Sequence, residues 1–187
     1  MFAYRSPKLT TVARAAWLMA GRSRLSLTGI FAKVILPLSL LPPLMLYYAG
    51  TYHGDAFMSG FSARDWRSIA IVFFLAELAT VGAMGPAIRG IARLNGVSTD
   101  RESSCLLAFA APIPLWLSSL ALFVPNFFVA ATAGVLALAF SCVIIYHGVS
   151  TLLRVRDDIV AGSIAYGIIA CGMVAWAMLL VIVIPLG

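Results

Sequence analysis

Five long apolar runs, separated by short segments that hold almost every charge, dominate the sequence. A helix needs about 20 apolar residues to cross roughly 30 Å of hydrocarbon, where it must satisfy its own backbone hydrogen bonds. The chain is 62% hydrophobic and 11% charged, whereas soluble domains are about 45–50% apolar and about 25% charged. The sequence therefore predicts an all-α polytopic membrane bundle of five transmembrane helices, over residues 30–49, 68–91, 104–124, 127–153 and 159–186.

The positions of Lys and Arg predict the orientation of this bundle. Basic residues in short connections are retained on the cytoplasmic side of a membrane. Arg64 and Arg67 lie in one connection beside Asp55 and Asp65. The basic residues on the opposite side are Arg5, Lys8, Arg14, Arg22, Arg24, Arg89, Arg93, Arg101, Arg154 and Arg156. We therefore expect a cytoplasmic N-terminus, an external C-terminus, and anionic lipid headgroups as partners of the basic side.

The excess of positive charge has a second possible explanation, which is nucleic-acid binding. The pI is near 9.7. Binding to nucleic acid requires a basic face that carries base-reading or stacking groups, but here the basic residues follow the connections between apolar runs. We therefore expect no nucleic-acid partner.

Residues 1–29 precede the first apolar run and form a separate cytoplasmic segment. Ser6-Pro7 is typical of a helix start, and the apolar residues Leu9, Val12 and Trp17 recur at helical spacing. This pattern predicts an amphipathic helix lying along the membrane interface. A partly disordered tail is the alternative. A secretory signal peptide is disfavoured because the first apolar run has full length, contains several prolines and lacks a small-x-small cleavage site.

Small residues at intervals of four predict where the helices pack, because close backbone approach drives helix association in lipid. One stripe is Gly82, Pro86 and Gly90, and another is Ser163, Gly167 and Cys171. We expect both to contact helices of the same chain, although a dimer seam is the alternative. The prolines of the first and third runs should kink their helices; they are Pro37, Pro42, Pro43, Pro112 and Pro114.

Glu77 is the one charged residue deep inside an apolar run. It lies about ten residues, or roughly 15 Å, from the outer end of its helix. A buried carboxylate is costly there, so Glu77 must be protonated, paired or exposed to water. It lies nearly opposite the Gly82 stripe, which predicts protein on both sides of a central helix. A proton or cation site and a neutral, hydrogen-bonded structural role both remain open.

The remaining candidates for chemistry favour structural roles. His147 ends the fourth run, and its depth differs from that of Glu77 by about 10 Å. The other histidine, His53, lies in the outer connection, so no zinc ligand set is expected. Asp157 and Asp158 should pair locally or cap the fifth helix. The cysteines, which show no C-x-x-C spacing, should act as packing residues; they are Cys105, Cys142 and Cys171. No catalytic or cofactor motif occurs.

Several short motifs, in a particular order, resemble bacterial members of the Yip family of five-span membrane proteins. They are Ser6-Pro7-Lys8, Leu36-Pro37-Leu38-Ser39-Leu40-Leu41-Pro42, Ala111-Pro112-Ile113-Pro114-Leu115-Trp116-Leu117, Tyr146-His147-Gly148-Val149 and Asp157-Asp158. Eukaryotic members are associated with Rab-type GTPases and vesicle traffic, and have a cytoplasmic N-terminus. This chain lacks their long N-terminal region and Asp-Leu-Tyr-Gly-Pro motif. The resemblance implies a location in the bacterial inner membrane and no assigned reaction.

Two functions remain in competition. The first is a non-enzymatic membrane-organising or partner-binding module, acting with a membrane-protein partner or as a homo-oligomer. The alternative is a small channel or transporter component in which Glu77 lies in a water-accessible cavity between kinked helices. An intramembrane enzyme is third, because no nucleophile–base pair or metal set can be assembled from the spans.

Overall fold

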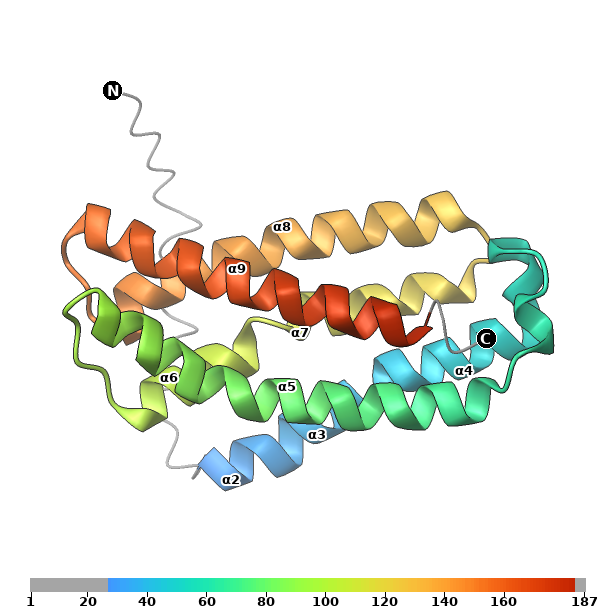
Figure 1. Ribbon diagram of the computed structural model, residues 1–187, viewed down its shortest axis with the longest axis horizontal. Helices are drawn as coiled ribbons and strands as arrows, with labels where there is room; N and C mark the ends of the chain where they lie inside the picture. The colour runs from blue at the N-terminus through green and yellow to red at the C-terminus, as the bar shows by residue number, and fades with distance from the viewer. Residues whose placement is uncertain (1–26, 184–187) are drawn as a thin grey trace.

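The computed structural model describes residues 27–183, which form a bundle of helices without a strand in that range. Five helical segments are long and apolar enough to cross a membrane, and they lie side by side along the long axis (Figure 1). Their bounds are Leu27–Phe57, Trp66–Leu94, Arg101–Phe123, Phe127–Leu152 and Asp158–Val181. The predicted all-α bundle with five spans is therefore confirmed. The expected interfacial helix lies almost entirely outside the described residues.

The first and third segments are interrupted where the prolines occur. The first consists of α2 (Leu27–Ile30), a π-helical turn (Phe31–Ile35), α3 (Leu36–Ser39) and α4 (Leu41–Phe57). The third consists of α6 (Arg101–Ala110), α7 (Ile113–Ser118) and a 3₁₀ turn (Ser119–Phe123), and it breaks at residues 111–112. Proline lacks the N–H that a continuous helix requires. The predicted kinks are thus present in both segments.

The other three segments are continuous helices: α5 (Trp66–Leu94), α8 (Phe127–Leu152) and α9 (Asp158–Val183). Each begins at a short polar side chain that accepts a hydrogen bond from a free backbone N–H of the first turn. Asp65 accepts from Ser68 N at 3.3 Å, Asn126 from Phe128 N at 2.9 Å, and Asp157 from Ile159 N at 2.8 Å. Asp157 therefore caps the fifth span, as the sequence indicated.

Asp100 caps α6 in the same way, in the connection that follows α5. Its Oδ2 accepts a hydrogen bond from Ser103 N at 2.9 Å. This bond from the backbone N–H of Ser103 lowers the pKa of Asp100 below its usual value. Since the ionised carboxylate is the better acceptor, the cap holds at neutral pH and weakens only in acid.

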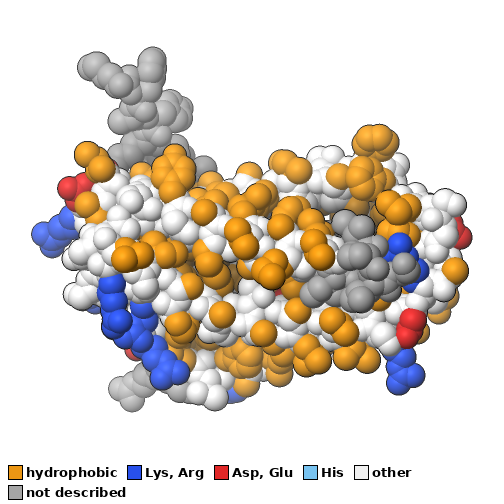
Figure 2. Space-filling model, in the orientation of Figure 1, with side chains coloured by type: hydrophobic (Ala, Val, Ile, Leu, Met, Phe, Trp, Pro, Cys, Tyr) orange, Lys and Arg blue, Asp and Glu red, His pale blue; other side chains and the backbone are white. Residues whose placement is uncertain are grey.

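The packed core lies at the end of the bundle where α5 ends and α9 begins. There Ile88, Leu107, Val149, Ile164 and Ile168 are fully buried against one another. The outer surface of the bundle is largely apolar along its length, and the charged side chains gather at the two ends (Figure 2). This distribution suits a bundle whose sides face lipid and whose ends face water.

The opposite end is closed by the connection between α4 and α5. This connection contains a 3₁₀ turn (Phe61–Ala63). Within it, Phe61 O accepts a hydrogen bond of 2.6 Å from the indole N–H of Trp66. Arg64 Nη1 donates to Val183 O at 3.0 Å and thereby ties the connection to the end of α9. Trp66 packs so closely on Gly50 of α4 that no side chain fits between them. The connection is thus fixed to both neighbouring helices.

Candidate functional site

Helix α5 places Glu77 inside the bundle. Its inward face also carries Val81, Gly85 and Ile88, which are buried against the neighbouring helices. Glu77 is only 4% exposed, because α5 contacts α4, α6 and α9. The intramembrane acid singled out from the sequence therefore lies in the protein interior rather than toward lipid.

The carboxyl group of Glu77 is incompletely hydrogen-bonded. The indole N–H of Trp116 on α7 faces it as a donor. Its Oε2 atom is buried and has no hydrogen-bond partner within residues 27–183. The nearby Thr80 hydroxyl donates instead to Ala76 O of its own helix, at 2.8 Å. A buried carboxyl oxygen without a partner carries the full cost of its desolvation, so this arrangement is not a satisfied structural network.

Ser141 on α8 is a second buried polar residue without a partner. It is 4% exposed, and its Oγ atom makes no hydrogen bond to any described residue. A serine in a membrane helix can usually bond to a carbonyl of its own preceding turn. Ser39 and Ser104, the other two buried serines of residues 27–183, do so, which makes the free hydroxyl of Ser141 an exception among the buried serines described.

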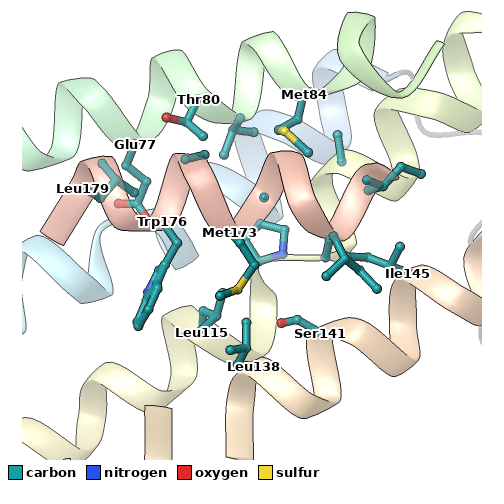
Figure 3. Close-up of a pocket in the computed structure, with 18 of the residues that line it drawn as sticks. Glu77, Thr80, Met84, Leu115, Leu138, Ser141, Ile145, Met173, Trp176 and Leu179 are labelled. Atoms are coloured by element: carbon teal, nitrogen blue, oxygen red, sulfur yellow. The ribbon is translucent and has the colours of Figure 1, made fainter. Parts of the chain in front are cut away.

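Glu77 and Ser141 line the same internal cavity, whose volume is about 170 Å³. Glu77 and Thr80 reach it from α5, while Ser141 and Leu138 lie across from them on α8, with Met173 and Trp176 of α9 between (Figure 3). Among its described lining residues none is Lys, Arg or His. The site is thus a largely apolar chamber with one acid (Glu77), two hydroxyls (Thr80 and Ser141) and two indoles (Trp116 and Trp176) among its described lining residues.

The cavity is closed at one end and reaches the outside between α8 and α9. These helices pack tightly near the loop that joins them, where Ile145 and Val149 contact Ala161, Ile164 and Ile168. Farther along they diverge (Figure 1). There Met173 both lines the cavity and is 39% exposed. This opening lies along the apolar side of the bundle, so it faces lipid rather than water.

His147, the other polar candidate from the sequence, does not reach this cavity. It lies beside Tyr146, with ring centroids 5.8 Å apart, and lines a separate surface pocket with Tyr166 of α9. The structure therefore does not bring His147 and Glu77 together. The described residues also contain no group of three or more His, Cys, Asp or Glu side chains that could hold a metal ion.

The small residues of α9 lie against α5. Ser163 Oγ is 2.7 Å from Asn95 Oδ1, and Cys171 Sγ is 3.8 Å from Met84 Sδ. A Cβ atom added at Gly167 would lie 2.8 Å from Ile91. This stripe contacts a helix of the same chain, as the sequence suggested.

The small residues of α5 require a correction. Gly82, Pro86 and Gly90 are exposed, and a Cβ atom at Gly82 or Gly90 would meet nothing within 4 Å. The contact expected within the chain is therefore not made by the described residues. Gly85, on the inward face, is the close-packing glycine instead, because its Cβ would lie 3.0 Å from Cys105 Sγ. Consequently the face of α5 that carries Gly82, Pro86 and Gly90 is not covered by residues 27–183, and the expectation of protein on both sides of this helix is not met by the described residues.

Sequence reasoning also missed two residues of the cavity, Trp116 and Ser141. Both occur in apolar runs where tryptophan and serine are unremarkable, and neither is near Glu77 in the chain. The free hydroxyl of Ser141 is visible only when every neighbouring helix is in place.

A family model described as the Yip1 domain matches residues 5–179, which is nearly the whole chain. No curated protein and no solved structure matches it.

Proposed function

The chain belongs to the Yip1 domain family, and we propose that it is a non-enzymatic membrane module that binds another transmembrane helix. The observation that carries this proposal is the outer face of α5. There Gly82, Ala83, Pro86 and Gly90 form an exposed strip that has no large side chain. The proposed partner helix comes from a second copy of the chain or from a different membrane protein.

The other outward faces differ from this strip. On α8 the exposed residues include Val135, Leu136 and Phe140, and on α9 they include Val174 and Met178. Large flexible side chains suit contact with lipid tails, whereas small residues let a second backbone approach closely. The face of α5 is therefore better suited to a helix than to lipid.

Substituting leucine for Gly82 and Gly90 together should weaken this association by about tenfold or more, because the bulky side chains hold the partner backbone away. The matched control is leucine at Ala131 and Ala139 of α8, which are also exposed and have the same spacing. Energy transfer between donor- and acceptor-labelled copies in liposomes measures self-association, and affinity purification in mild detergent measures capture of a different protein.

Each outcome decides the proposal. If the α5 variant loses energy transfer and the α8 variant keeps it, the partner is a second copy of the chain. A co-purifying membrane protein that only the α5 variant loses identifies a different partner. If the α5 and α8 variants behave alike in both measurements, the face of α5 is an ordinary lipid contact and the proposal is wrong.

The proposed setting is the inner membrane of a bacterium, with the Arg-rich end of the bundle in the cytoplasm. Arg89 and Arg93 end α5, and Arg101 begins α6. Arg154 and Arg156 occupy the loop between α8 and α9. Anionic headgroups would neutralise this end. Labelling of Ser98→Cys and Ser59→Cys variants in intact cells tests the orientation, since an impermeant thiol reagent should reach only the latter.

A channel or transporter component is the second candidate, and the cavity around Glu77 favours it. A permeant proton or cation needs a polar binding site within the membrane, which Glu77 and Ser141 would supply. In liposomes, Glu77→Gln should abolish proton or cation flux, whereas Glu102→Gln should not. Absence of flux from the wild-type protein would remove this candidate.

A further inference from the structure

We propose that the cavity between α5, α7, α8 and α9 is a binding site for a lipophilic amine, whose ammonium group pairs with Glu77. This inference is independent of the partner helix on α5 and of any flux through the bundle.

The size of the cavity sets what can enter it. A single water needs roughly 10–15 Å³ of such space, and an apolar cavity of about 150 Å³ is large enough to hold benzene. The cavity here measures about 170 Å³. It therefore has room for a ring or a short hydrocarbon chain in addition to a small polar group.

The polar groups of the cavity select the head of the ligand. Glu77 Oε2 and Ser141 Oγ are buried, face the space from different helices, and accept hydrogen bonds from no described residue. A buried carboxylate needs an opposite charge, and no cationic side chain lines this part of the structure. An ammonium group supplies both the charge and up to three N–H donors.

The walls of the cavity select the body of the ligand. Apart from Glu77, Thr80 and Ser141, the lining is largely hydrophobic and includes the aromatic side chains of Phe73 and Trp176. Aromatic rings attract cations through their faces and also pack against apolar groups. A small inorganic cation would leave most of this surface without a partner, whereas an amine with a hydrocarbon body covers it.

The route into the cavity points to the same class of molecule. The opening between α8 and α9 lies at mid-length of the bundle, beside the exposed Met173. A ligand that enters there first dissolves in the bilayer. An amphiphile can do this, whereas a strongly hydrated ion cannot without a large desolvation cost.

The test uses three probes that share one aromatic body: benzylammonium, benzyl alcohol and benzoate. Binding to the purified full-length protein in detergent is followed by tryptophan fluorescence, since Trp116 and Trp176 line the cavity. We expect benzylammonium to bind most tightly and benzoate least. Glu77→Gln should weaken the binding of benzylammonium by about tenfold or more, because a charge-assisted hydrogen bond is lost. The same substitution should change the affinity for benzyl alcohol by less than about threefold.

Two further variants make the result decisive. Glu77→Asp, which keeps the carboxyl group, should retain the preference for benzylammonium over benzyl alcohol, and it provides a second readout if Glu77→Gln is poorly folded. Glu102→Gln, an exposed acid at the start of α6, should change nothing. Equal binding of benzylammonium and benzyl alcohol to the wild-type protein would overturn the proposal, because the cavity would then recognise only the apolar body. Loss of benzylammonium binding in Glu102→Gln would overturn it as well.

Discussion

Gly50→Ala should destabilise the bundle by about 3 kcal/mol, which is near the upper end of the usual cost of overpacking a core. An added Cβ atom at Gly50 would overlap the indole ring of Trp66. That ring is 4% exposed, and its N–H is bonded to Phe61 O at 2.6 Å. The indole therefore cannot move aside without breaking this bond and opening the connection between α4 and α5. Chemical unfolding in a fixed detergent, followed by fluorescence, measures the change.

Gly134→Ala provides the matched control for Gly50→Ala. Gly134 lies in the middle of α8, and a Cβ atom there would meet nothing within 4 Å. Alanine is the better helix former by up to about 1 kcal/mol, so this variant should be unchanged or slightly more stable. Trp66→Leu should lower the free energy of unfolding by less in the Gly50→Ala background than in the wild type, because the overlap between the added Cβ atom and the indole ring is then absent. Additive effects of the two substitutions would show that Gly50 and Trp66 do not interact as the structure indicates.

In a Trp116→Phe background, where no indole N–H is left without its acceptor, Glu77→Met should stabilise the bundle by about 1–3 kcal/mol, because it removes a buried Oε2 atom that has no hydrogen-bond partner among the described residues. Methionine is unbranched and adapts to the space that the glutamate side chain occupied. Glu102 is the only other glutamate, and it lies exposed in the first turn of α6, where a negative charge is favourable. Glu102→Met should therefore bring no gain. The same unfolding measurement compares the two variants.

This comparison also separates the two roles that the sequence left open for Glu77. A structural glutamate would be fully bonded, and its replacement by methionine would lower stability. A glutamate held for binding is a cost to the free protein, and its loss raises stability while it removes ligand affinity. A less stable Glu77→Met variant, with Glu77→Gln close to wild type, would favour the structural role.

Much of the architecture follows from local properties of the chain. The number and approximate bounds of the spans follow from hydropathy, because a bilayer imposes a fixed length on every crossing helix. The breaks near Pro42 and Pro112 follow from the missing N–H of proline. The cap at Asp157 follows from the affinity of a carboxylate for the free N–H groups of a helix start. None of these features requires knowledge of which helices are neighbours.

The inward faces of the helices could not be predicted in the same way. In a soluble helix, polar residues mark the side that faces water, but lipid is as apolar as the protein interior. Gly82 and Gly85 are therefore equivalent by sequence, although one is exposed and the other packs against Cys105. For this reason the sequence predicts an internal contact for the stripe of Gly82, Pro86 and Gly90, which residues 27–183 do not make at Gly82 and Gly90.

Glu77 is recognisable as unusual from the sequence alone, because it is an isolated charge within an apolar run. An acid within a membrane is costly whichever way its side chain faces. The surroundings of Glu77 depended on the tertiary structure. Trp116, Ser141 and Trp176 come from three other helices, and only their packing places them around one cavity. The sequence thus determined that five helices cross the membrane and that one carries an acid. The tertiary structure alone decided that this acid faces a chamber, because chain-distant side chains meet only when the helices pack.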